Sequence, residues 1–301
     1  MRIGVAATPD VALPTLNWLL TSSHEIVLII SQPDRAAGRG QEIRSSPVST
    51  WANDHEIALI QPVSPDELVG VIEDLDCIVT IGYGVLLPES ILKLPLYGFI
   101  NLHFSILPAY RGAAPVQRAI ENGEVVTGVS VFALDKGMDT GPVYCSATIS
   151  IDPTWRTEEL INELALISPA VVEMALKAIS QGEIPTPQIG ESSLAPKISK
   201  EEAKIDWNER ADIVLRRIRA FYPAPIAWCT WKGESFRVTK ATSHLAILPP
   251  GEISIIDGCV VIGCGEDSAI SALSVIPSGK REMPAIDWVR GARLEIGSHF
   301  G

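Results

Sequence analysis

Short apolar runs alternate with amphipathic segments along the first 183 residues of the chain. The apolar runs have the length of strands, and the segments between them carry side chains at helical spacing, as Leu13, Leu16 and Leu20 do. We expect strands at 3–7, 25–31, 57–60, 76–81, 98–102, 128–134 and 142–151, and helices beginning near 10, 47, 65, 88, 114 and 157. This alternation predicts an α/β fold with a doubly wound, mostly parallel sheet that helices cover on both faces.

The pattern changes after residue 183. Residues 184–203 are rich in Pro and Ser and only weakly periodic, which predicts a linker, although Ser199 and Glu202 have the spacing of a capping box that would begin a helix. Beyond it, a helix is expected at 211–220 and short strands at 227–231, 235–240, 251–256, 259–263 and 270–276. Short strands separated by regular turns predict a small OB-like β-barrel. The expected domains are therefore 1–183 and 204–301, joined by 184–203.

One long loop stands out within the first domain. Residues 32–47 contain Arg35, Arg39 and Arg44 and little that could be buried. Loops of this length are usually functional or disordered. Ser46 followed by Pro47 is typical of a helix start, and it marks the end of the loop.

Composition and cysteine content restrict the class of protein that this chain can be. Hydrophobic residues make up 47% of the 301 positions, enough for a sizeable core. No apolar run reaches the roughly 18 residues that a membrane span needs, and Met1 leads into a strand without a signal-peptide pattern. Five cysteines without metal-binding spacing predict reduced thiols in a cytoplasmic protein, and no metal-ligand cluster is visible. The absence of a coiled-coil pattern favours a monomer.

Charge is unevenly distributed along the chain. The formal net charge is −12, which argues against a general nucleic-acid binder. Residues 1–183 carry 10 basic and 22 acidic residues, whereas 204–301 carry 12 and 11. Within 210–240, 7 basic residues accompany only Asp212 and Glu234. The second domain therefore presents a local basic patch on an acidic protein.

Polar side chains gather where one buried strand ends. Asn101, His103 and Ser105 occupy alternate positions, so in an extended chain their side chains share one face. Polar groups at the carboxyl end of a strand are typical of a site in an open α/β sheet. A lone His at a strand end is more often structural, but a loop about thirty residues later supplies Asp139, a candidate partner that would hold the tautomer of His103 and tune its pKa.

A glycine pair could suggest a different cofactor. Gly82-Tyr83-Gly84 follows an expected strand, as the dinucleotide-binding fingerprint does. It lacks the third glycine and an acidic ribose partner about twenty residues later. The sequence therefore argues against nicotinamide binding.

A series of short motifs extends through both domains. In chain order they include Thr8-Pro9-Asp10, Gln32-Pro33-Asp34-Arg35, Gly38-Arg39-Gly40, Asn101 to Gly112, Gly137 to Gly141, Lys200 to Trp207 and Pro277 to Lys280. The order NLHxSxLPxxRG followed by GMDTG resembles the folate-dependent formyltransferase family. The arginine loop and the second-domain motifs are similar to those of members that act on tRNA.

The resemblance implies a Rossmann-variant domain that binds 10-formyltetrahydrofolate as co-substrate and an OB-like domain that helps to hold tRNA. It implies formyl transfer to the amino group of initiator methionyl-tRNA in the cytoplasm, with no metal. The catalytic residues would be Asn101, His103 and Asp139. The co-substrate would contact Ser105, Ile106, Leu107 and Pro108, and tRNA would contact Arg35, Arg39, Arg44, Arg216 and Arg217.

The chemistry of these side chains suits such a reaction. Formyl transfer to an amine passes through a tetrahedral intermediate, whose oxyanion Asn101 or a suitably protonated His103 can stabilise. The attacking amine must lose a proton. Asp139 can support a cationic His103 or take part in that proton transfer, and the sequence leaves both roles open.

The chain departs from the family pattern at a few positions. Phe104 stands where a small residue is frequent, and Ile106 where Leu is usual. Gln41-Glu42 replaces a pair that is usually rich in lysine. With the net negative charge, this last change predicts weak or strongly salt-sensitive tRNA contact.

Other functions use the same residues. One keeps the folate chemistry but transfers the formyl group to another amine, such as an amino-sugar nucleotide. Another uses water as acceptor, which gives a 10-formyltetrahydrofolate hydrolase. A third is a folate- or tRNA-binding protein without activity. The second domain with its basic patch argues against a small acceptor, and intact Asn101, His103 and Asp139 argue against an inactive protein.

Overall fold

The structure is a computed structural model that describes residues 1–37 and 42–301. Its contacts divide the chain into two compact units. Unit 1 comprises Met1–Pro115, Val126–Ser150 and Ile161–Pro196, and unit 2 comprises Val116–Val125, Ile151–Leu160 and Lys197–Gly301. Most of the expected linker, up to Pro196, thus makes its contacts within unit 1. The domain boundaries at 183 and 203 stay a prediction.

Unit 1 is built on a seven-stranded sheet with the order β5-β2-β1-β6-β7-β8-β9. The strands are β1 (Arg2–Ala7), β2 (Glu25–Ile30), β5 (Leu59–Ile60), β6 (Cys77–Ile81), β7 (Phe99–His103), β8 (Val126–Ala133) and β9 (Val143–Ser150). Pairings from β5 through β7 are parallel, and β7-β8 and β8-β9 are antiparallel. The expected mostly parallel α/β fold is confirmed.

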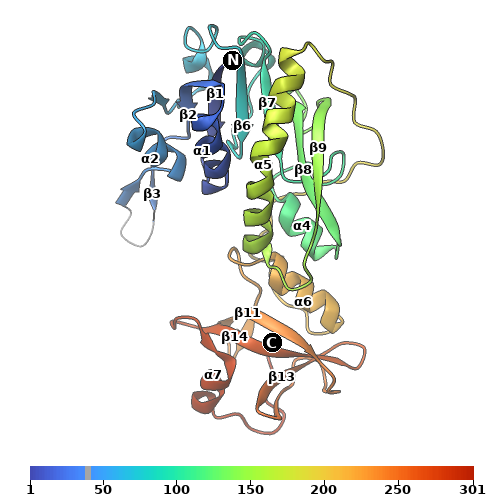
Figure 1. Ribbon diagram of the computed structural model, residues 1–301. Coiled ribbons are helices and arrows are strands. Elements are labelled where there is room, and N and C mark those ends of the chain that lie inside the picture. Colours follow the sequence, from blue (N-terminus) through green and yellow to red (C-terminus); the bar gives the residue numbers. More distant parts are fainter. Residues whose placement is uncertain (38–41) are drawn as a thin grey trace. The chain divides into compact units, whose positions relative to one another are not determined.

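Helices flank this sheet. They are α1 (Leu13–Thr21), α2 (Pro47–Asp54), α3 (Glu89–Leu92) and most of α5 (Thr157–Ser180), with 3-10 turns η1 (Asp10–Ala12) and η2 (Pro65–Leu68). Figure 1 shows α1 and α5 on the same face of the sheet. The five residues of β6 are all buried, because a central parallel strand covered on both faces has no side exposed to water.

Of two helices expected in unit 1, one needs correction and one is confirmed. The helix expected after Pro65 is only the 3-10 turn η2, although Ser64 and Glu67 form a complete capping box there. Gly70, two residues beyond the turn, has a left-handed backbone (φ +80°) that an α-helix cannot continue through. The helix expected at 47 is confirmed, with the Ser46 side chain accepting a hydrogen bond from the Ser49 amide.

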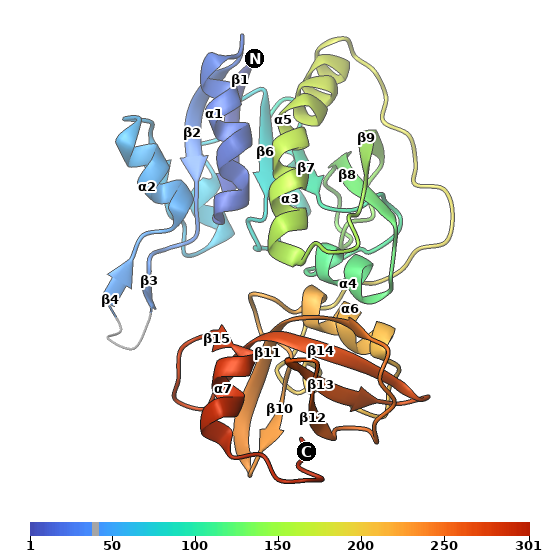
Figure 2. The same ribbon diagram turned by 60° about the horizontal axis from the view of Figure 1, so that its bottom comes forward.

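The arginine loop is more regular than expected. It contains a two-stranded antiparallel ribbon formed by β3 (Arg35–Ala37) and β4 (Glu42–Arg44), in which Arg35 lies opposite Arg44. Figure 2 shows this ribbon extending beyond the strands of the main sheet. The third arginine of the loop, Arg39, lies outside the described residues.

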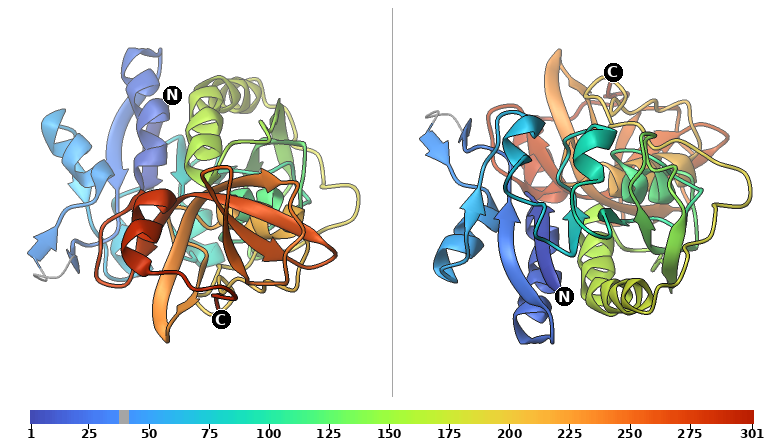
Figure 3. Two further views of the ribbon diagram at one scale, coloured as in Figure 1. Left: turned by 90° about the horizontal axis from the view of Figure 1, so that it is seen from below. Right: turned by 90° about the horizontal axis from the view of Figure 1, so that it is seen from above.

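Unit 2 is an antiparallel β structure, as expected for the second domain. Its strands are β10 (Trp228–Trp231), β11 (Glu234–His244), β12 (Ile253–Ile256), β13 (Cys259–Cys264), β14 (Ser268–Pro277) and β15 (Met283–Pro284), in the order β10-β11-β14-β13-β12 with β15 on β14. It also contains α4 (Pro115–Glu121) from Val116 onward and α6 (Ala211–Ala220), both close to their expected bounds. A further helix, α7 (Ala285–Ala292), was not expected, and it packs against β13 and β14 (Figure 3).

The helix expected to begin at Ser199 is absent. The Ser199 hydroxyl does accept a hydrogen bond from the Glu202 amide at 3.0 Å, but this pair closes a single turn. The backbone groups of Ala203 and Ile205 then hydrogen-bond to Trp228, so the chain extends alongside β10 instead of winding into a helix.

Candidate active site

A polar pair joins two adjacent parallel strands at the centre of the unit 1 sheet. Asn101 on β7 pairs in register with Thr80 on β6. The Thr80 hydroxyl donates to Oδ1 of Asn101 at 2.7 Å, and the Ile100 carbonyl, at 3.1 Å, is a second and longer acceptor. The bond from Thr80 orients the amide of Asn101, because its oxygen is occupied and its NH2 group must point the other way. Among the described residues none accepts a hydrogen bond from that NH2 group, so Asn101 can donate to a ligand.

His103, two residues along β7, is held between two partners. Its Nε2 lies 2.8 Å from the Tyr110 carbonyl oxygen, which can only accept, so Nε2 carries a proton. Its Nδ1 lies 3.7 Å from Oδ2 of Asp139. The imidazole is 6% exposed, and the Phe132 ring meets it edge-on at 6.4 Å. The structure thus brings His103 and Asp139 together, as the sequence predicted.

Burial controls the protonation of His103. Loss of solvent lowers the pKa of His103 below its ordinary 6.5, and the Asp139 carboxylate and the Tyr110 carbonyl oppose that shift without cancelling it. The histidine is therefore neutral near pH 7, with its proton on Nε2 and a lone pair on Nδ1. That lone pair is available to take up a proton, and the nearby carboxylate would stabilise the resulting cation.

Asp139 owes its position to its backbone. Its φ of +55° lies in the left-handed region, which Asp tolerates better than most residues. Its Oδ2 accepts a 2.7 Å hydrogen bond from the Gly112 amide. Gly112 has φ +121°, and a Cβ there would lie 2.8 Å from the Ala195 carbonyl oxygen, so only glycine fits.

The expected co-substrate segment forms the turn after β7. Ser105 is fully buried, and its hydroxyl donates to the Ala109 carbonyl at 2.6 Å, which ties the turn together. The strand ends at His103, so Ser105 does not continue the face that Asn101 and His103 share. Leu107 is 8% exposed, whereas Ile106 and Pro108 are half-buried. Contact of this segment with a co-substrate stays a prediction.

Ser130 anchors the same turn from β8. Its hydroxyl donates to the Ser105 carbonyl at 2.8 Å and accepts from the Leu107 amide at 3.1 Å. It is fully buried, and it pairs in register with His103. Ser130 thereby fixes the turn next to His103.

The arginines expected to contact tRNA lie in two different settings. Arg35 and Arg44 are exposed on the β3-β4 ribbon. Arg216 forms an ion pair with Asp212 at 3.2 Å, and Arg217 donates to the Glu202 carbonyl. The two unit 2 arginines therefore already have partners within their own unit, and their contact with tRNA stays a prediction.

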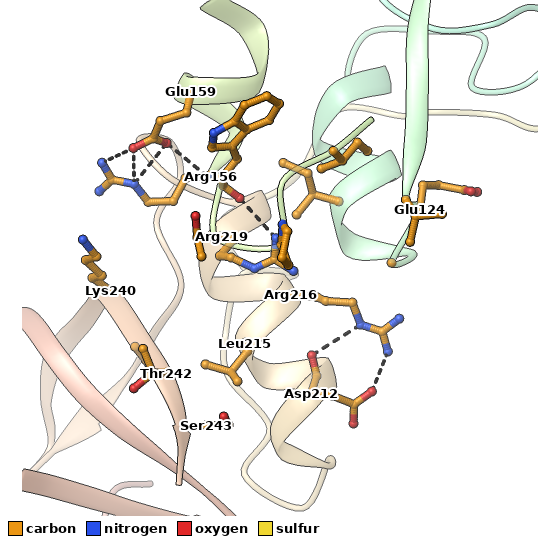
Figure 4. A pocket seen from close by; sticks show the side chains of 18 of the residues that line it. Glu124, Arg156, Glu159, Asp212, Leu215, Arg216, Arg219, Lys240, Thr242 and Ser243 are labelled. Carbon is orange, nitrogen blue, oxygen red and sulfur yellow. Dashed lines mark hydrogen bonds and ion pairs between the residues drawn. The ribbon is translucent and has the colours of Figure 1, made fainter. Parts of the chain in front are cut away.

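Arg216 lines a hollow of about 970 Å³ in unit 2 (Figure 4). Arg156 also lines it and pairs with Glu159 at 2.7 Å. Arg219 reaches the hollow too, and burial together with the neighbouring Arg216 lowers its pKa. The expected basic patch thus lies partly around a hollow whose cations are largely paired.

The described residues contain neither a metal-binding cluster nor a membrane-spanning helix. Within 1–37 and 42–301, no group of three or more His, Cys, Asp or Glu side chains is placed to hold a metal ion. Over the same residues, no helix is both long and apolar enough to cross a membrane.

Sequence reasoning missed two residues of this site. Thr80 is the single hydroxyl-bearing side chain in the otherwise apolar β6. That polar position in a buried strand was the only feature of the sequence that could have pointed to it. Gly112 lies inside a recognised motif, but its contact with Asp139 spans 27 residues and no local pattern marks it.

The fold is a doubly wound sheet in which Asn101 and His103 lie at the end of β7 and Asp139, from the loop after β8, approaches His103. This arrangement agrees with the family that the sequence motifs indicate. The family model "Formyl transferase" matches residues 1–176, and "Formyl transferase, C-terminal domain" matches 197–293. The chain therefore belongs to the formyl transferase family, a family of enzymes, and the expected fold and enzyme class are confirmed.

Within that family, the curated relatives are methionyl-tRNA formyltransferases. The one from Mycobacteroides abscessus is 41% identical over 308 residues, which cover 99% of this chain and 99% of the relative. Further relatives with the same name are 37–41% identical. The match extends over the whole chain, as the sequence motifs predicted.

Solved structures share the fold. The methionyl-tRNA formyltransferase from Clostridium thermocellum has a TM-score of 0.58 at 17% identity, over 80% of this chain and 93% of its own. HypX from Aquifex aeolicus, solved with tetrahydrofolic acid, has a TM-score of 0.69 at 20% identity, over 98% of this chain and 48% of its own. The likeness to both structures shows a shared fold.

Proposed function

We propose that this chain transfers the formyl group of 10-formyltetrahydrofolate to the α-amino group of initiator methionyl-tRNA, which gives N-formylmethionyl-tRNA for translation initiation. The observation that carries the proposal is that β7 carries both an amide donor, Asn101, and a neutral imidazole, His103. Thr80 orients the amide of Asn101, and His103 faces Asp139 across 3.7 Å. Similarity to methionyl-tRNA formyltransferases along the whole chain supports this choice of acceptor.

Asn101 stabilises the developing negative charge. The amine nitrogen attacks the formyl carbon, a C–N bond forms, and the electrons of the C=O bond move to its oxygen. The NH2 group of Asn101 donates a hydrogen bond to that oxyanion. A donor of this kind is typically worth about 100–1000-fold in rate.

His103 and Asp139 handle the proton. An α-amino group, with a reference pKa of about 7.7–8.0, attacks in its neutral form, and its nitrogen must lose a further proton once the C–N bond has formed. The lone pair on Nδ1 of His103 takes that proton, and the Asp139 carboxylate stabilises the imidazolium that forms. The same proton then passes to N10 of the folate as the C–N10 bond breaks, which releases tetrahydrofolate.

The remaining residues bind the substrates. Ser105, Ile106, Leu107 and Pro108 contact the folate, and Arg35, Arg39, Arg44, Arg216 and Arg217 contact the phosphates of tRNA. The protein acts as a monomer in the cytoplasm, where its five free thiols stay reduced.

A formylation assay with 10-formyltetrahydrofolate and charged initiator tRNA, run across a salt series, tests this function. We expect formylmethionyl-tRNA in a yield that falls as salt rises. Folate turnover without that product would indicate another amine, such as an amino-sugar nucleotide, and release of formate would indicate a hydrolase. Absence of any turnover would indicate a binding protein. Substitution His103→Ala should abolish turnover and leave folate binding largely intact.

A further inference from the structure

Both partners of His103 lie on strained backbone. Tyr110, whose carbonyl accepts from Nε2, has φ +62°, and Asp139 has φ +55°. Left-handed conformations are unfavourable at non-glycine residues and persist only where the surroundings impose them. The neighbours of these two residues therefore decide the geometry of the site.

The segment 186–195 supplies those neighbours. It follows α5 and, in yellow, passes outside β9 in Figures 1 and 2. The Ser193 hydroxyl accepts from the Tyr110 amide at 2.9 Å, and the Ser193 carbonyl accepts from the Arg111 amide at 2.9 Å. Ala195 adds a backbone bond to Arg111 at 2.7 Å. The turn that carries the Tyr110 carbonyl is thus bonded to this segment.

Gln188 makes the corresponding contact with the Asp139 loop. Its Nε2 donates to the Asp139 carbonyl and to the Gly141 carbonyl, each at 2.8 Å. Its Oε1 accepts from Nε and Nη2 of Arg111 at 3.1 and 2.6 Å. Both protons and both lone pairs of the amide are therefore in use, and neither a carboxylate nor an apolar side chain could make the same four bonds.

We propose that the segment 186–195 is a positioning element of the active site, in which Gln188 sets the distance of the Asp139 carboxylate from His103 by binding the Asp139 loop and Arg111 at once. Gln188 does not touch the reacting atoms. It acts through Asp139, whose side chain can reach both His103 and the Gly112 amide only while its own carbonyl is held. The catalytic role of Asp139 belongs to the proposed function, whereas the positioning itself does not depend on the substrate.

Two substitutions separate the bonds of Gln188. Gln188→Met removes all four, and Gln188→Glu keeps the acceptor for Arg111 while it removes the donors to the two carbonyls. We expect kcat for formyl transfer to fall about 10–100-fold in both, because small displacements of catalytic groups cost that much. We expect KM for both substrates to stay within about threefold, since the Gln188 amide is already fully bonded within the protein.

A direct readout of His103 accompanies the kinetics. Asp139 raises the pKa of His103, so a displaced carboxylate should lower it further in both variants. An NMR titration of the full-length protein measures this, with the His103 signal assigned by its loss in His103→Gln. The matched control is Ile72→Val, a fully buried core substitution away from the site, which costs stability without moving Asp139.

The outcomes are distinct. A lower kcat together with a lower His103 pKa in the Gln188 variants, and neither in Ile72→Val, would establish the positioning role. An unchanged His103 pKa, or a kcat loss no larger than in Ile72→Val, would overturn it. If Gln188→Met fails to fold, Gln188→Glu decides the matter. If the unsubstituted protein makes no formylmethionyl-tRNA, the proposed function fails, and the titration still tests the positioning.

Discussion

The hydroxyl of Thr80 donates a 2.7 Å hydrogen bond to the amide oxygen of Asn101, its register partner on the next parallel strand. This bond decides which way the amide faces. Thr80→Val keeps the shape of the side chain and removes the donor, so the amide can flip. We expect kcat to fall about 10–100-fold, less than the roughly 100–1000-fold for complete loss of an oxyanion donor because the amide is still present, with KM nearly unchanged. Steady-state kinetics measure the effect.

Thr127→Val is the matched control for this change. Thr127 is also a buried threonine in the same sheet, on β8, and none of the described side-chain hydrogen bonds uses its hydroxyl. Thr127→Val should keep its activity within about twofold, because it breaks none of the described hydrogen bonds. Equal losses in both variants would mean that the Thr80 bond does not orient Asn101.

The charge of Asp139 can be removed without removing its contact with Gly112. Asp139→Asn keeps an oxygen that can accept from the Gly112 amide, but it no longer stabilises a cationic His103. We expect kcat to fall by about 10²–10⁴-fold, as for loss of a general acid-base function. The pKa of His103 should fall as well, because Asp139 raises it. Kinetics and an NMR titration check the two effects.

Asp135→Asn provides the comparison in the same loop. Asp135 accepts from the Gly137 amide and from the Thr140 hydroxyl, bonds that an Asn oxygen can replace. We expect little change in kcat. A large loss of kcat in Asp135→Asn, together with nearly full activity in Asp139→Asn, would show that Asp139 is not the critical carboxylate.

Burial of His103 should appear in the pH dependence of stability. Because burial lowers its pKa in the folded state, the unfolded chain binds a proton first as pH falls below 6.5. The free energy of unfolding should therefore decrease as pH falls from 6.5 toward the lowered pKa, by at most about 1.4 kcal/mol per pH unit. Above 6.5 the contribution is constant.

His103→Gln should flatten this part of the stability profile. Urea unfolding of unit 1 at several pH values above and below 6.5 measures the slope. His299→Gln serves as the control, because it removes an exposed histidine instead of a buried one. A slope that survives in His103→Gln would show that another group causes it.

The arginine ribbon should contribute to RNA binding and not to chemistry. Arg35 and Arg44 lie opposite each other on β3 and β4, and like charges in that position repel unless an anion lies between them. We expect the double substitution Arg35→Ala, Arg44→Ala to raise KM for tRNA about tenfold and to reduce the salt slope of binding by about two, with kcat at saturating tRNA unchanged.

Lys93→Ala is a suitable control for the ribbon, since Lys93 directly follows α3 in the same unit and its side chain is 73% exposed. It removes one positive charge from the same unit but not from the ribbon. If it weakened tRNA binding as much as the ribbon variant, the effect would come from net charge alone.

Gly112 should tolerate no side chain. A Cβ at Gly112 would meet the Ala195 carbonyl at 2.8 Å, and the Gly112 amide that holds Asp139 would have to move. We expect Gly112→Ala to cost about 1–3 kcal/mol in stability and to reduce kcat at least tenfold. Thermal unfolding and kinetics measure both.

Gly182→Ala isolates the contribution of the clash. Gly182 also has a left-handed backbone (φ +73°), but nothing lies within 4 Å of a Cβ there. It should lose about 1 kcal/mol of stability and no activity. Similar activity in the two variants would contradict a role for Gly112 in placing Asp139.

Much of the fold could be predicted from local patterns. The apolar runs marked the strands, and α6 and the start of α5 lie where periodicity placed them. Errors arose where a local signal competed with pairing elsewhere. The capping box at Ser199 closes only a turn, because the following residues hydrogen-bond to Trp228. The arginine loop forms a ribbon because its two ends pair with each other, and hydrophobic periodicity gives no sign of that pairing.

By itself, the sequence determined the family, because Asn101, His103 and Asp139 stand in an order specific enough to indicate a formyltransferase, and it predicted that these side chains carry the chemistry. Only the tertiary structure decided how those groups are held. Thr80 and Gln188 lie 21 and 49 residues from the atoms that they orient. The physical reason is that a hydrogen bond depends on distances of a few tenths of an ångström, which strand register and chain crossing set and local composition does not.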